Sequence, residues 1–171
     1  LGMRAMEYMG GIVPALRSIP QPVIAAIRGP AYGGGMCLSL GADIRLAGRS
    51  AMFCNAGINN GLAGTELGVS WLLPRAVGTS NAAQILLTGM SVDADEALRI
   101  GLTQRLVPDA ELESTAGELA ATIAAQPPLA VEGAKRAVNV AGTVPTREGL
   151  RIEAEGQAVC LRSDDMKEAL A

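Results

Sequence analysis

Three consecutive glycines, Gly33, Gly34 and Gly35, stand where a predicted strand passes into a predicted helix. Glycine adopts positive φ easily and lets a ligand come close to the backbone. The first N–H groups of the following helix lack partners within the helix and carry partial positive charge. This turn could therefore bind a phosphate, or a carbonyl oxygen that gains negative charge during a reaction. It could also be a tight turn that binds nothing.

The residues after the glycines argue against two common phosphate-binding motifs. A P-loop carries Lys and then Ser or Thr at this point, whereas Met36 and Cys37 stand here. The glycine spacing also differs from the G-x-G-x-x-G dinucleotide motif. An oxyanion is therefore favoured over a nucleotide as the ligand of this turn.

Acid–base chemistry in this chain has to come from residues other than His, because the 171 residues contain none. Between Cys37 and the next predicted helix the carboxylates are Asp43 and Glu66. Asp43 precedes a predicted strand and is expected to be structural. Glu66 lies in the glycine-containing loop 61–68, directly before a helix. There it could transfer a proton for a substrate or cap the helix, and the sequence leaves both possibilities open.

The elements around these residues predict an α/β fold. A short apolar run at 23–27 is typical of a buried parallel strand. Further strands are expected at 44–47, 51–54 and 104–107, and helices at 3–17, 36–42, 69–77, 80–88 and 94–100, the last capped by Asp93. This alternation predicts parallel strands with crossover helices over residues 1–108. Residues 109–171 are expected to be α-helical, over 109–125, 128–141 and 146–170.

Composition excludes several classes of function. The net charge is −3 and aromatic residues make up 2%, so the chain has neither the basic stripe nor the stacking surface of a nucleic-acid binder. Three cysteines without a C-x-x-C pair, and no His, argue against a metal site. No apolar run is long enough to span a membrane and no secretory signal is recognised, so a cytoplasmic location is expected. Because Leu1 starts within a helical pattern, we expect the chain to begin partway through a larger protein.

Several segments together resemble the crotonase superfamily, which includes the enoyl-CoA hydratases and isomerases. The strongest are IPQPVIAAI at 19–27, GPAYGGG at 29–35 and ADIR at 42–45. PRAVG at 74–78 and LTG at 87–89 resemble later landmarks of the family, and the resemblance continues in register to residue 108.

The resemblance implies a crotonase-like spiral of ββα units, followed by a helical C-terminal region, 109–171, that trimerises. A homotrimer or hexamer is then expected. It also implies a fatty enoyl-CoA thioester as substrate, with no separate cofactor. The thioester carbonyl would accept hydrogen bonds from two backbone N–H groups. One matches Gly34, and the other belongs to an earlier segment that is absent from this chain. Expected oxyanion-binding or substrate-binding residues are Gly34, Ala31, Gly33, Gly35, Cys37 and Gly57.

Two positions depart from the pattern of the resembling hydratases. Those enzymes hold water between two glutamates, which match Cys37 and Gly57 here. The resembling isomerases use one carboxylate in the loop that contains Glu66, although the spacing in this chain is one residue longer. The sequence therefore favours isomerisation, with Glu66 as the catalytic residue. A non-catalytic acyl-CoA-binding homologue and a ligand-free trimeric scaffold remain as alternatives.

Overall fold

The computed structural model describes residues 2–169, which divide into two compact units. Residues 2–18 and 23–117 form the first unit, and residues 19–22 and 118–169 form the second. The first unit contains the glycine turn and Glu66. The role of residues 109–171 in trimerisation stays a prediction.

Two helices open the first unit in place of the single helix expected over 3–17. They are α1 (Met3–Gly10) and α2 (Ile12–Ser18). Pro14 has no N–H to donate to the carbonyl of Gly10, and its ring crowds that carbonyl. Together with the flexible Gly10-Gly11 pair, it separates the two helices.

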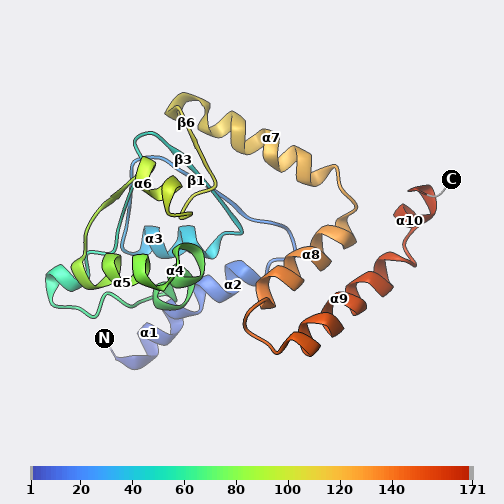
Figure 1. Ribbon diagram of the computed structural model, residues 1–171, viewed down its shortest axis with the longest axis horizontal. Coiled ribbons are helices and arrows are strands. Elements are labelled where there is room, and N and C mark those ends of the chain that lie inside the picture. Colours follow the sequence, from blue (N-terminus) through green and yellow to red (C-terminus); the bar gives the residue numbers. More distant parts are fainter. Residues whose placement is uncertain (1, 170–171) are drawn as a thin grey trace. The chain divides into compact units, whose positions relative to one another are not determined.

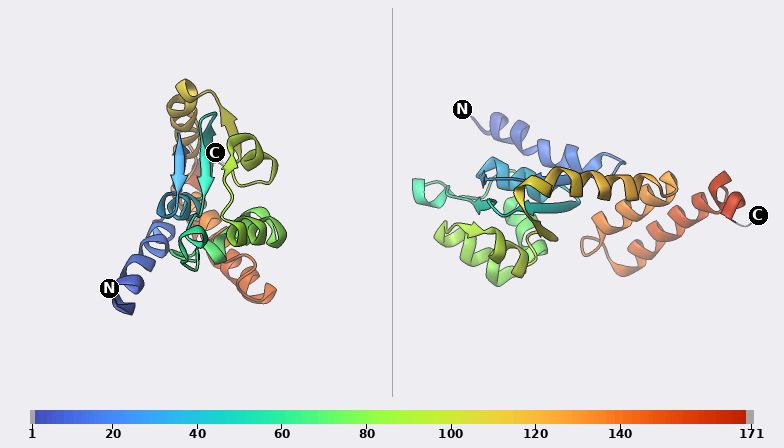
Figure 2. Two further views of the ribbon diagram at one scale, coloured as in Figure 1. Left: turned by 90° about the vertical axis from the view of Figure 1, so that its left-hand side faces the viewer. Right: turned by 90° about the horizontal axis from the view of Figure 1, so that it is seen from above.

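The strands of the first unit form two three-stranded sheets. One sheet has the order β1-β3-β6 and is parallel throughout, as expected. Figure 2 shows the short strands of the first unit in two further views. The other has the order β2-β4-β5, in which β2 and β4 are parallel but β4 and β5 are antiparallel. The strands are β1 (Ile24–Ile27), β2 (Pro30–Tyr32), β3 (Ile44–Gly48), β4 (Met52–Cys54), β5 (Val92–Asp93) and β6 (Arg105–Val107).

Helices follow pairs of strands, which gives the ββα order expected for the fold. β1 and β2 lead into α3 (Gly34–Gly41), and β3 and β4 lead through the 3-10 turn η1 (Ile58–Asn60) into α4 (Val69–Val77). Helix α5 (Thr79–Thr88) packs beside α4 in Figure 1. Helix α6 (Ala94–Arg99) begins where expected, because the Asp93 side chain accepts a hydrogen bond from the N–H of Glu96 at 2.8 Å.

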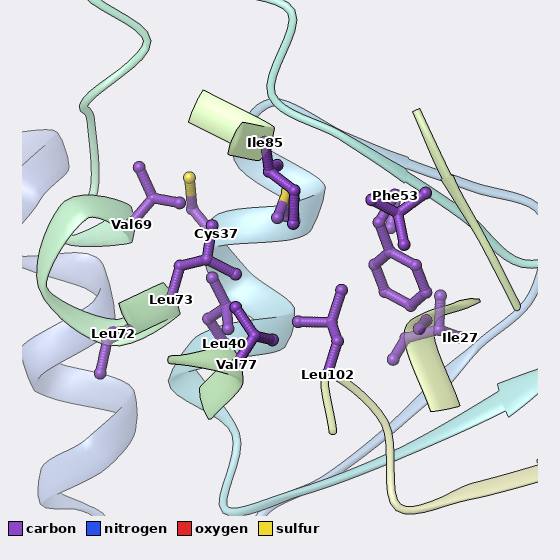
Figure 3. Packing of buried hydrophobic residues seen from close by; sticks show 14 of the residues in the cluster. Ile27, Cys37, Leu40, Phe53, Val69, Leu72, Leu73, Val77, Ile85 and Leu102 are labelled. Atoms are coloured by element: carbon purple, nitrogen blue, oxygen red, sulfur yellow. The ribbon is translucent and has the colours of Figure 1, made fainter. Parts of the chain in front are cut away.

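The core of the first unit is aliphatic and surrounds α3. Buried residues of α3 contact others from α4, the strands and α6, with Phe53 as the one buried aromatic ring among the described residues. Figure 3 shows Cys37 beside Val69 and Leu73. The N-terminus of α3 is therefore held by α4, the helix that follows the Glu66 loop.

The C-terminal part of the chain is helical, as expected, with two differences in its boundaries. A 3-10 turn, η2 (Asp109–Glu111), precedes the first helix, and residues 161–163 interrupt the last one. Ser163 begins the final helix by accepting a hydrogen bond from the N–H of Met166. The expectation for residue 170 lies outside the described residues. The helices are α7 (Leu112–Ala124), α8 (Pro128–Val140), α9 (Thr146–Cys160) and α10 (Asp164–Ala169).

None of the helices over residues 2–169 combines the length and apolar character needed to cross a bilayer.

Candidate active site

Gly33 gives the glycine turn its shape. Its φ of 51° and ψ of −116° are strained for a residue with a side chain. Its N–H donates to the carbonyl of Cys54 at 2.8 Å, and its carbonyl accepts from the N–H of Cys37 at 3.1 Å. Both backbone groups of Gly33 are thus engaged within the protein. Gly33 contributes its conformation to the site and has no N–H left for a substrate.

Gly34 and Gly35 form the first turn of α3, where N–H groups lack partners within the helix. No acceptor in the described part of the chain bonds to either N–H. Behind them, Ala31 of β2 is buried, and its Cβ lies 4.0 Å from the position that a Cβ on Gly35 would take. The turn therefore offers the N–H of Gly34 as a hydrogen-bond donor at the positive end of α3.

Glu66 lies next to this turn, although 33 positions separate it from Gly33. Its Oε1 atom is 3.8 Å from the position of a Cβ built on Gly33. The residue is half-buried. Helix α4 starts from Gly68 and has no side-chain cap, so the capping interpretation of Glu66 is wrong. The carboxylate instead faces the glycine turn.

Leu67 is a residue of this site that sequence reasoning missed. It is the one non-glycine residue with positive φ, 49°, among residues 2–169. This conformation costs an L-residue about 1–2 kcal/mol. Its Cδ1 atom lies 3.7 Å from the position of a Cβ on Gly34. Nothing in the local sequence signals this, because leucine normally avoids the left-handed region.

Cys37, which the family resemblance matches to the first hydratase glutamate, is fully buried. Its Sγ is 3.5 Å from the backbone carbonyl oxygen of Glu66, to which the thiol donates. Burial, and then the charge of Glu66, raise the pKa of Cys37 to about 11. The thiol therefore stays neutral at physiological pH and supplies no carboxylate-like base.

The raised pKa of Cys37 predicts a loss of stability in alkali. An unfolded cysteine has a pKa of 9.0. Between that value and about 11 the unfolded chain releases a proton that the folded chain retains, so the free energy of unfolding falls as pH rises. The loss should reach at most about 3 kcal/mol. Urea unfolding between pH 8 and pH 10.5 would measure it.

The matched variant for this measurement is Cys37→Ser, which keeps a small donor that does not ionise. Its stability should fall less with pH than that of the unchanged chain, because all other titrating groups are common to both. Parallel curves for the two proteins would contradict the assignment.

The family resemblance matches Gly57 to the second hydratase glutamate, and the structure leaves no room there for a side chain. A Cβ on Gly57 would lie 2.8 Å from the Cα of Gly64. The turn is held by the N–H of Leu62, which donates to the carbonyl of Gly57 at 2.9 Å, and by Asn55, whose Nδ2 donates to the carbonyl of Gly64 at 2.8 Å. The loop therefore packs its backbone where a glutamate would need space.

The described residues bring no three or more His, Cys, Asp or Glu side chains together as metal ligands would be. The groups that the site offers to chemistry are the Gly34 N–H, the Glu66 carboxylate and the Cys37 thiol.

Comparison with known proteins gives consistent matches. Residues 11–171 match the family model described as enoyl-CoA hydratase/isomerase. A Mycobacterium tuberculosis protein named "Probable enoyl-CoA hydratase EchA12" is 55% identical over 122 residues, which are 71% of this chain and 43% of that protein. The chain thus spans less than half the length of this curated relative.

Solved structures agree in fold. A crystal structure from Mycobacterium abscessus, described as "a probable enoyl-CoA hydratase/isomerase", is 44% identical with a TM-score of 0.93, and the match covers 98% of this chain and 65% of that one. A structure described as "a monofunctional enoyl CoA isomerase from M.smegmatis" is 46% identical with a TM-score of 0.77, and the match covers 84% and 68% of the two chains. These likenesses confirm the crotonase-like fold.

Proposed function

Because this chain belongs to the enoyl-CoA hydratase/isomerase family, we propose that it acts on a fatty enoyl-CoA thioester and moves the double bond. One observation carries the proposal: the Glu66 carboxylate of loop 61–68 lies beside Gly33, the residue that precedes Gly34. A base from one segment thus lies near the turn that offers the oxyanion donor.

In the proposed reaction the thioester oxygen accepts a hydrogen bond from the N–H of Gly34. Glu66 removes a proton from C2, and the electron pair moves toward the thioester oxygen as the double bond shifts. The donor and the positive end of α3 stabilise the negative charge on that oxygen. The protonated Glu66 then returns the proton at C4, which regenerates the carboxylate. A single acid–base group completes the cycle, and no water is consumed.

Hydration fits this site less well. In the resembling hydratases, two carboxylates hold and activate the water molecule that is added to the substrate. Position 37 carries a neutral thiol, and the backbone fills the space at position 57. The M. smegmatis structure described as a monofunctional isomerase supports the same preference, whereas the M. tuberculosis relative is named as a hydratase.

The distinguishing experiment incubates the protein with 2-enoyl-CoA and 3-enoyl-CoA substrates and follows both by mass and absorbance. We expect the 3-enoyl thioester to gain the absorbance of a conjugated thioester without a change in mass. A mass increase equal to one water would overturn isomerisation in favour of hydration. Tight binding of both thioesters without turnover would instead indicate a non-catalytic acyl-CoA-binding protein.

A further inference from the structure

Cys37 contacts the catalytic segment through the backbone rather than through a substrate. The carbonyl oxygen of Glu66 accepts two hydrogen bonds, one from the N–H of Val69 at 3.0 Å and one from the Cys37 thiol at 3.5 Å. The first bond belongs to the start of α4. The second connects the Glu66 peptide to α3, the helix whose N-terminus carries Gly34.

The segment that receives this bond is held in an unusual conformation. Leu67 follows the bonded carbonyl and has a φ of 49°. Its side chain packs on the core, with Cδ1 3.7 Å from where a Cβ on Gly34 would lie, while the Glu66 side chain reaches toward Gly33. An unfavourable backbone conformation persists only when its surroundings fix it. Two observations therefore concern the peptide between Glu66 and Leu67. Its carbonyl oxygen accepts a hydrogen bond from the buried Cys37 thiol, and the φ of Leu67 is strained.

We propose that Cys37 is a positioning residue whose thiol fixes the Glu66–Leu67 peptide, and thereby places the Glu66 carboxylate over the Gly33–Gly34 turn. This role rests on the proposed function, in which Glu66 transfers the proton. In the resembling hydratases this position carries a glutamate. Here its cysteine would instead hold Glu66, the catalytic base supplied by loop 61–68, in place.

The chemistry of the thiol suits this role. Its pKa of about 11 keeps the donor protonated throughout the physiological range. A carboxyl group at the same buried place would repel the carbonyl oxygen of Glu66 if ionised, and could donate to it only by staying protonated against its usual pKa. A methyl group would fill much of the space without donating a hydrogen bond.

The test compares Cys37→Ala with Cys37→Ser on the 3-enoyl-CoA substrate. The alanine variant should lose about tenfold to a hundredfold in kcat, as expected when a catalytic group is displaced by about 1 Å, with KM changed less than about twofold. Serine restores a donor, although its oxygen lies closer to the helix than sulfur does, so it should recover a large part of kcat. A residue that only filled space would not distinguish the two variants in this way.

Ser39→Ala is the matched control, because Ser39 is also buried in α3 and donates to a backbone carbonyl, that of Met36 at 2.7 Å. It should keep the kcat of the unchanged chain. Circular dichroism and thermal unfolding test whether each variant is folded. If Cys37→Ala does not fold, Cys37→Val, which also lacks a donor, is compared with Cys37→Ser in its place.

Equal kcat in the alanine and serine variants would overturn the positioning role. Glu66→Gln separates this result from failure of the proposed function. If Glu66→Gln is inactive while Cys37→Ala is fully active, only the role of Cys37 is wrong. If Glu66→Gln is fully active, the proposed function itself is wrong.

Discussion

Replacing Glu66 with glutamine is expected to lower kcat for double-bond migration by about a thousandfold or more. General acid–base groups contribute about 10²–10⁴ to a rate, and within residues 2–169 no carboxylate other than Glu66 is found beside the glycine turn. Glutamine has nearly the same shape but can neither accept nor return the proton. The Kd for an acyl-CoA should change little, because the proposed thioester contact is the N–H of Gly34. Steady-state kinetics and calorimetric titration would measure the two quantities separately.

Two variants make this result specific. Glu118→Gln removes the same charge from the exposed face of α7 and should leave kcat unchanged. Glu66→Asp keeps a carboxylate but withdraws it by one methylene, so a partial loss is expected. Wild-type turnover in Glu66→Gln would refute the assigned base. An unchanged kcat with a raised KM would mean that Glu66 binds substrate and does not transfer the proton.

Most elements of the fold could be predicted from local patterns. The apolar run at 23–27, the glycines before α3 and Asp93 before α6 each have a local physical cause, and the structure contains the corresponding elements. β2 and β5 could not be predicted, because they have three and two residues and gain their hydrogen bonds only by pairing with β4. Pro30 at the start of β2 also lacks an N–H and reads locally as a turn.

The site was only partly predictable, for a reason of sequence distance. Gly34 and Glu66 could be assigned as the proposed donor and base only with the help of the family resemblance, because local context left a ligand-free turn and a helix cap equally open. The contact between the Cys37 thiol and the Glu66 carbonyl joins residues 29 positions apart, and neither residue signals it. The conformation of Leu67 is opposite to the preference of leucine. The close packing of Gly57 on Gly64 had one signal, the repeated glycines of the loop, which also fit an ordinary flexible connection.

Restoring the two hydratase glutamates, as Cys37→Glu with Gly57→Glu, is expected to give an unstable protein without hydratase activity. A Cβ at position 57 would meet the Cα of Gly64 at 2.8 Å, so the loop would have to move, at a cost of about 1–3 kcal/mol. A glutamate at 37 would have to lie in a fully buried site that faces the carbonyl oxygen of Glu66, and either burying its charge or keeping it protonated typically costs several kcal/mol more. A typical domain has only about 5–15 kcal/mol of stability to lose.

Single variants separate the two causes of that loss. Gly57→Ala adds only the Cβ and should lower the urea midpoint, whereas Ala63→Glu adds a charged side chain at an exposed position of the same loop and should not. If Gly57→Ala unfolds like the unchanged chain, the steric reason for glycine at 57 is wrong. If the double-glutamate variant folds and adds water to 2-enoyl-CoA, the loop can open to admit the second glutamate. The two missing carboxylates, and not the packing of the loop, would then be the reason that the unchanged chain does not hydrate its substrate. We expect the opposite, because the backbone of residues 57–64 occupies the place where the second glutamate would have to stand.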